Sequence, residues 1–138
     1  MRIRLIANTP NVEVMVATSM LTTTSGAQPS TLYDRLQSNP EKVRQVVERL
    51  EVQHGNVLEH NRLIWLVQAS SEEIMDVLLC TRHLSFNRLA DTKWLMSGNL
   101  RAVVEYSQHK DTEFARRLIE SVKGVAPTIH RSIRRDKK

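Results

Sequence analysis

The sequence has 138 residues, which is enough for one domain with a buried core and too few to expect two. A single cysteine, Cys80, excludes a disulfide within the chain and fits a reducing compartment. Charges interrupt the N-terminal apolar run, and nowhere does the chain reach the roughly 20 apolar residues that a membrane span needs. We therefore expect a cytoplasmic protein with no membrane partner.

The net charge of +5 is concentrated at the C-terminus. The last eight residues, RSIRRDKK, hold five basic side chains and one acidic one, whereas the other 130 residues hold fifteen basic and fourteen acidic ones. We expect one domain over residues 1–126 and a basic tail over residues 127–138. Such a tail can attract nucleic acid, although a solvated and frayed terminus is the commoner outcome.

The spacing of apolar residues predicts two strands and five helices. Ser70 and Glu73 have capping-box spacing, and the prolines at positions 10 and 40 suit the first turn of a helix. Residues 22–31 are rich in Ser, Thr, Gly and Pro and predict a loop. The expected strands are 2–7 and 61–68, the second one buried, and the expected helices are 10–20, 40–53, 70–81, 91–108 and, capped by Asp111, 112–122.

These elements predict an α/β (α+β) fold in which helices predominate and pack on a small sheet. Two strands alone make a marginal sheet. Either the chain has further strands, or homo-oligomerisation completes the sheet, and we expect the second.

The histidines and the cysteine do not have the spacing of a metal site. His54 and His60 are six residues apart around a glycine, and Cys80 with His83 supplies only two ligands on one helix face. We therefore expect no metal. Cys80 follows two leucines, which favours a buried and unreactive thiol.

Three short segments hold the side chains that could carry chemistry. In HGNVLEH (54–60), the Gly55-Asn56 pair favours a turn that brings His54 back towards Glu59-His60. Arg82-His83 is expected at the end of a helix, where a cation is favourable. Asn99 and Arg101 could meet a phosphate or the edge of a base.

In their order along the chain, HGNVLEH, Arg82-His83 and the run W-x-x-S-G-N-L-R ending at Arg101 resemble the flavin-dependent thymidylate synthases. The resemblance implies the methylation of dUMP to dTMP with methylenetetrahydrofolate, NADPH and FAD, without a cysteine nucleophile. It also implies a homotetramer with the flavin between subunits. The residues that match flavin-contacting or neighbouring positions are His54, Glu59, His60, Arg82, His83, Asn99 and Arg101.

The sequence departs from the pattern of that family mainly on the substrate side. Leu79 and Leu84 stand where the family has glutamine and arginine, and Lys110 stands where it has a substrate-binding arginine. Thr92 occupies the position of a serine near the substrate, so the resemblance gives Arg82 and Thr92 as catalytic candidates and Lys110 as the substrate-binding one. Two alternatives stay open: a non-catalytic relative that binds a flavin or nucleotide, and a small nucleic-acid-binding protein.

Overall fold

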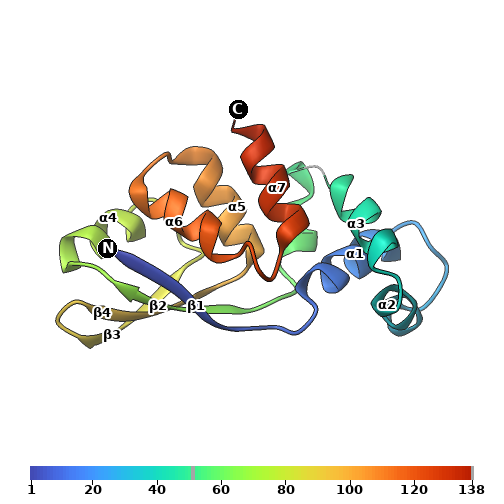
Figure 1. The fold of residues 1–138 in the computed structure, drawn as a ribbon, viewed down its shortest axis with the longest axis horizontal. Coiled ribbons are helices and arrows are strands. Elements are labelled where there is room, and N and C mark those ends of the chain that lie inside the picture. The colour runs from blue at the N-terminus through green and yellow to red at the C-terminus, as the bar shows by residue number, and fades with distance from the viewer. Residues whose placement is uncertain (51, 138) are drawn as a thin grey trace.

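The computed structural model describes residues 1–50 and 52–137, and gives only the backbone of residues 52–54. Within these residues the chain forms a four-stranded antiparallel sheet with seven α-helices, so the expected fold class is confirmed (Figure 1). The strands are β1 (Arg2–Asn8), β2 (Leu63–Gln68), β3 (Ser85–Ala90) and β4 (Lys93–Gly98). The helices are α1 (Val12–Thr22), α2 (Pro29–Gln37), α3 (Pro40–Glu48), α4 (Ser71–Leu78), α5 (Leu100–His109), α6 (Glu113–Ser121) and α7 (Pro127–Asp136), with a 3-10 helix η1 (Val52–Leu58).

The sheet has the order β1-β2-β4-β3, and its two faces differ. Side chains alternate along each strand, and those of Leu63, Trp65 and Val67 are buried on the face towards the helices. Trp65 donates its indole N–H to Ser121 Oγ on α6 at 2.8 Å, which fixes α6 over the centre of the sheet. The opposite face carries Ile64 and Leu66, which remain partly exposed, so the expectation of a buried strand is met on one face only.

The expected helix over residues 91–108 is wrong in its first half. Residues 93–98 form β4, which pairs with β2 and with β3, a strand that the helical spacing did not predict. Asn99 lies at the boundary and caps α5, because its Oδ1 accepts a hydrogen bond from the Ala102 N–H at 3.0 Å. The sheet is therefore completed by strands of the same chain, and homo-oligomerisation is not needed to complete it.

Several other boundaries differ from the expected ones. Helix α2 begins at Pro29, inside the expected loop 22–31, and α3 ends at Glu48. Thr112, and not Asp111, caps α6 through a hydrogen bond to the Ala115 N–H. The capping box of Ser70 and Glu73 is confirmed, with both of its hydrogen bonds present at the start of α4.

Helix α4 also ends earlier than expected, at Leu78, so Arg82 and His83 lie in the loop before β3 and not on a helix. The same early end leaves Cys80 exposed, which corrects the expectation of a buried thiol. The apolar LLC run is part of the surface because only Ile74 and Val77 of α4 face the core.

Residues 127–136 are not a frayed terminus, because they form α7. Ile129, His130 and Ile133 on one face of α7 are buried in the core. Glu13 of α1 fixes the start of α7, since its Oε1 accepts a hydrogen bond from the Thr128 N–H at 2.7 Å. Among the described helices, none combines the length and the apolar character required to cross a membrane.

Candidate functional site

Asn61 holds the segment after η1 against the start of α5. Its Nδ2 donates to the Leu58 carbonyl at 2.8 Å, and its Oδ1 accepts from the Leu100 N–H at 2.9 Å. One side chain thus gives a hydrogen-bond partner to the Leu58 carbonyl and to the Leu100 N–H. Without it, the turn and the start of the helix would leave these two backbone groups unpaired. The consequence is that Glu59, two residues before Asn61, lies beside the first turn of α5.

A chain of ion pairs joins the three segments that the sequence singled out. Arg101 binds Glu59, and Arg101 Nε donates to Glu105 Oε1 at 2.8 Å. The other oxygen of Glu105 lies 3.2 Å from His83 Nε2. Hydrogen bonds to Glu105 and Glu59 raise the pKa of Arg101 above its ordinary value, so the guanidinium stays charged. The series Glu59–Arg101–Glu105–His83 is called the ion-pair chain below.

Glu105 was missed at the level of sequence, although a signal for it existed. It lies four residues after Arg101 on α5, and that spacing places two helical side chains on one face. Asn61 gave no comparable signal, because its role depends on the meeting of two segments far apart in sequence.

Two glycines allow the close packing of these segments. A Cβ on Gly55 would lie 3.2 Å from Arg101 Nε, so glycine lets the backbone of η1 approach the guanidinium. A Cβ on Gly98 would lie 2.7 Å from Leu84 Cδ2 and 3.1 Å from the His83 carbonyl oxygen. Leu84 is 3% exposed, so its side chain points into the core while His83 beside it faces outward.

A small hollow of about 130 Å³ opens at the His83 end of the ion-pair chain. Arg82, His83, His109 and Lys110 supply cationic or imidazole groups, and Glu105, already bound by Arg101 and His83, is the carboxylate among the lining residues. Positive charge is therefore in excess, which suits an anionic group such as a phosphate. The hollow is lined by Cys80, Thr81, Arg82, His83, Glu105, Tyr106, His109 and Lys110.

Thus Arg82, His83 and Lys110 line one hollow, and Glu59 and Arg101 join it through Glu105. The other predicted site residues lie elsewhere or have another task. Thr92 lies in the turn between β3 and β4, at the opposite end of β4 from Gly98 and Asn99, so six strand residues of roughly 3.4 Å each separate it from the hollow. Asn99 caps α5, His60 is exposed just after η1, and the side chain of His54 lies outside the described part.

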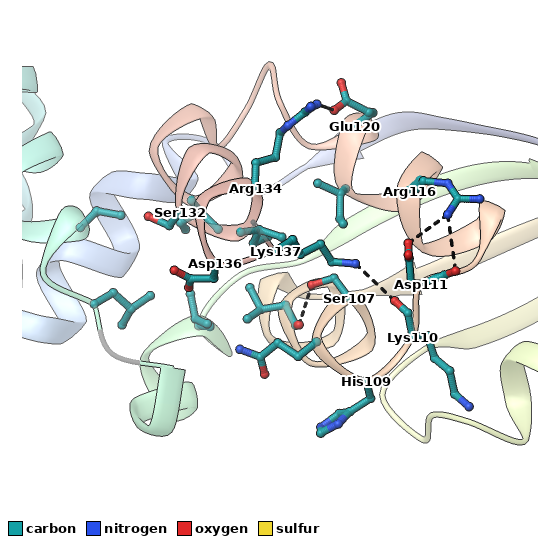
Figure 2. Close-up of a pocket in the computed structure, with 18 residues that line it drawn as sticks. Ser107, His109, Lys110, Asp111, Arg116, Glu120, Ser132, Arg134, Asp136 and Lys137 are labelled. Atoms are coloured by element: carbon teal, nitrogen blue, oxygen red, sulfur yellow. Dashed lines mark hydrogen bonds and ion pairs between the residues drawn. The ribbon is translucent and has the colours of Figure 1, made fainter.

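A larger cavity of about 950 Å³ lies between α5, α6 and α7, and residues of α3 and η1 also line it (Figure 2). Its inner wall is apolar and its rim carries ion pairs, among them Arg134 with Glu120 and Arg116 with Asp111. Of the predicted site residues it includes Lys110, whose carbonyl accepts from Lys137 Nζ at 3.4 Å. Figure 2 shows the Lys110 side chain pointing away from α7, and Lys110 also lines the smaller hollow.

Comparison with known proteins shows a likeness of fold. The structure is similar to the crystal structure of flavin-dependent thymidylate synthase ThyX from Helicobacter pylori, which is complexed with FAD and dUMP. The TM-score is 0.67 at 10% sequence identity, and the match covers 91% of this chain and 96% of that one. No family model and no curated protein matches the sequence. The chain therefore shares the fold of ThyX, which the motif order had led us to expect.

Proposed function

We propose that this chain binds FAD and a pyrimidine nucleotide and catalyses the reductive methylation of dUMP to dTMP. Methylenetetrahydrofolate would supply the carbon and NADPH the electrons. The observation that carries the proposal is the ion-pair chain, which connects all three motif segments and ends at a hollow with an excess of positive charge. The ThyX likeness supports it, because that protein is complexed with both FAD and dUMP.

The residues present fit an anionic cofactor or substrate. Arg82 and Lys110 are basic residues that line the hollow, and the pyrophosphate of FAD and the phosphate of dUMP are both anions. Bound flavin, once reduced by NADPH, would supply the electrons that turn the transferred methylene into a methyl group.

This chain's own residues would hold and orient these groups. Arg101 is held by two carboxylates, which leaves its guanidinium with a fixed direction beside Gly55. Glu105 similarly fixes the ring of His83 at the mouth of the hollow. Preorganised donors of this kind lower the cost of ordering side chains when a ligand binds.

The test separates binding from turnover. Purified protein is titrated with FAD and its absorbance and flavin fluorescence are recorded, and turnover is then measured with dUMP, methylenetetrahydrofolate and NADPH. We expect a flavin spectrum altered by binding, and formation of dTMP and tetrahydrofolate. Protein that leaves the spectrum of added FAD unchanged would contradict the proposal.

A second candidate is a relative that binds flavin or nucleotide without catalysing the reaction. Two placements favour it: Leu84 is turned into the core, and Thr92 lies at the far end of β4. In this case FAD or dUMP binds, but no dTMP forms. Formation of dTMP that requires the protein and NADPH would exclude this second candidate.

A further inference from the structure

The larger cavity has the size of a small-molecule binding site. Its volume of about 950 Å³ lies within the range of roughly 300–1,000 Å³ that ligand pockets have. Protein interiors are close-packed and seldom leave voids larger than a water molecule. Side chains that border such a space lack contact atoms on one side, and a bound molecule would supply them. The cavity is therefore a candidate binding site in its own right.

The wall of this cavity is apolar and is built by several elements. Each of α3, η1, α5, α6 and α7 contributes at least one buried aliphatic side chain to it, and these are Val47, Leu58, Val104, Ile119, Ile129 and Ile133. Aliphatic side chains pack against the body of an apolar molecule but offer it no hydrogen bond. The part of a ligand that lies against this wall should therefore be hydrocarbon or aromatic.

Helix α7 forms one side of the cavity and is held in place at two points. At its start, Glu13 Oε1 of α1 accepts a hydrogen bond from the Thr128 N–H at 2.7 Å. Further along, Glu120 Oε1 of α6 lies 3.0 Å from His130 Nε2 and accepts from Arg134 at 2.7 Å. These contacts keep α7 at a fixed distance from α6, so the cavity is pre-formed. A pre-formed site lowers the cost of ordering the protein when a ligand binds.

The rim of the cavity carries both signs of charge, but its carboxylates are already bound by arginine. The ion pairs are Asp111–Arg116 at 2.9 Å, Glu120–Arg134 at 2.7 Å and Asp136–Arg135 at 3.5 Å. Hydrogen bonds from His130 and Arg134 hold the pKa of Glu120 below its ordinary value, so this carboxylate stays charged and paired. The acidic groups of the rim are therefore largely neutralised by their own partners.

Lys137 is the cation at the rim that is left for a ligand. Its Nζ lies 3.4 Å from the Lys110 carbonyl oxygen, which is long for a hydrogen bond. Over residues 1–50 and 52–137, none of the ion pairs includes Lys137. Figure 2 shows its side chain reaching from α7 towards Lys110, whose own side chain points away. One ammonium group beside an apolar wall suits one negative charge on an apolar body.

We propose that the larger cavity binds a small organic anion with a single negative charge on an apolar body, such as a monocarboxylate of medium chain length. The body packs against the aliphatic wall, and the head group binds the Lys137 ammonium. This site is separate from the smaller hollow, because α5 turns Val104 towards the cavity and Glu105 towards the hollow. Among the described lining residues, only His109 and Lys110 are shared by the two. The proposal therefore does not depend on the binding of flavin or nucleotide.

A fluorescent probe of the same chemistry tests the site. Anilinonaphthalene sulfonate carries one negative charge on an aromatic body, and its fluorescence rises in apolar surroundings. We expect saturable binding to the folded wild type and displacement of the probe by octanoate. Acetate has the head group without the body, and octanol has the body without the charge. Each should therefore displace the probe about tenfold less well than octanoate, or worse.

Charge reversal at Lys137 tests the head-group contact. Lys137→Glu should weaken the binding of both the probe and octanoate by about tenfold or more, because a carboxylate then faces the anion. Lys123→Glu is the matched control, since Lys123 is exposed and does not line the cavity. Arg82→Ala changes the smaller hollow and should leave the affinity of the probe as it is in the wild type.

A bulky side chain in the wall tests the apolar contact. Ser132 lines the cavity from α7 and is partly buried, so Ser132→Trp should fill part of the space and weaken probe binding. Ser30→Trp, at an exposed position of α2, is its control. Partly unfolded proteins also bind this probe, so the binding is measured only on variants whose thermal melts are as cooperative as that of the wild type.

Three outcomes would overturn the proposal. The first is a folded wild type that binds the probe without saturation or not at all. The second is an unchanged affinity in Lys137→Glu, or a loss in Arg82→Ala instead, which would place the anion elsewhere. The third is displacement by octanol as effective as that by octanoate, which would assign the cavity to neutral apolar molecules. If Ser132→Trp does not fold, the comparison of Lys137→Glu with Lys123→Glu decides by itself.

Discussion

Arg101 has the most connected position among the predicted site residues, with Glu59 and Glu105 as partners and Gly55 against its Nε. Its side chain is 32% exposed, so water screens the ion pairs in part and they contribute little to the stability of the fold. These ion pairs instead fix the orientation of the Arg101 guanidinium, because a guanidinium held from two sides presents its remaining N–H groups at a fixed angle. The effect of its removal should therefore appear in ligand binding more than in unfolding.

We predict that Arg101→Ala weakens FAD binding by about tenfold or more, an expected loss of roughly 1.4 kcal/mol or more, and changes the melting temperature little. The measurements are a fluorescence titration with FAD and a thermal melt followed by circular dichroism. Arg117→Ala is the matched control, since Arg117 forms the same i,i+4 pair with Glu113 on α6. Equal flavin affinity in both variants would show that Arg101 does not orient the cofactor.

Gly98 is the position where a single methyl group should be costly. We predict that Gly98→Ala destabilises the protein by about 1–3 kcal/mol, because the new Cβ would overlap Leu84 Cδ2 and crowd the His83 carbonyl. The free energy of unfolding is measured with denaturant. Gly124→Ala serves as the control, because nothing lies within 4 Å of a Cβ placed there.

The steric explanation of Gly98→Ala can be tested with a second substitution. If overlap with Leu84 is the cause, the added change Leu84→Ala should cost less in the Gly98→Ala protein than in the wild type. Strictly additive losses would point to another cause.

At the scale of elements, α7 depends on a cap from far away in the sequence. Its own N-cap, Ala126, has no side-chain acceptor, and Glu13 of α1 accepts from the Thr128 N–H instead. Burial raises the pKa of Glu13 above its ordinary value, against the lowering effect of the hydrogen bonds from Thr128. The folded protein therefore holds the Glu13 proton more tightly than the unfolded chain does.

The sign of the pH dependence follows from this raised pKa. The stability that Glu13 contributes is fully present below its ordinary pKa of 4.5, which is the pKa expected in the unfolded chain. It is lost as the pH rises through the higher pKa that Glu13 has in the folded protein. We predict that Glu13→Gln, which keeps the acceptor but cannot ionise, gains stability relative to the wild type as the pH rises from 4 to 7. Denaturant unfolding at a series of pH values measures it.

Glu13→Ala separates the cap from the charge. Relative to Glu13→Gln, loss of the acceptor should cost about 0.5–2 kcal/mol at every pH, because the Thr128 N–H then loses its partner. Parallel pH profiles for the wild type and Glu13→Gln would show that Glu13 titrates normally in the folded protein.

The elements that the sequence predicted well are those with local signals. The capping box of Ser70 and Glu73 marked α4, and Asn39-Pro40 marked α3. The failure over residues 91–108 has a physical cause, since Leu95, Asn99 and Ala102 have helical spacing while the short apolar run 94–96 fits a strand or a helix equally well. Pairing with β2 and β3 decides between the two, and that pairing is not local information.

For the site, the sequence predicted the segments but not their connections. Glu59, His83 and Arg101 were predicted, whereas Glu105, which links His83 to Arg101, became visible only when α5 was placed beside the loop before β3. The direction of the Leu84 side chain could not be predicted either, because no local pattern tells whether a residue beside His83 faces the site or the core.

At the scale of the whole molecule, α7 shows how composition can hide a structural element. Five basic residues among the last eight predict a solvated tail, yet Ile129 and Ile133 are one helical turn apart and buried. His130 and Arg134 add contacts to Glu120 of α6, at 3.0 and 2.7 Å. The helix therefore belongs to the folded core.

We predict that a chain ending at Ala126 loses cooperative unfolding or melts far below the full chain. Loss of two buried isoleucines costs about 2–5 kcal/mol each, which is a large part of a typical total of 5–15 kcal/mol. A thermal melt followed by circular dichroism measures it. Arg131→Ala with Arg135→Ala, which removes tail charge without removing the buried face, is the control and should melt near the wild type.

The contact between Glu13 and Thr128 also sets an order of events at the ribosome. The two residues are 115 positions apart, and at typical synthesis rates that stretch takes roughly 6 to 23 seconds to appear. Until then α1 has been made but lacks the helix whose first turn it caps. Acquisition of the native state is thus postponed until α7 has been made, and a nascent chain paused before Thr128 should remain open to proteases and chaperones.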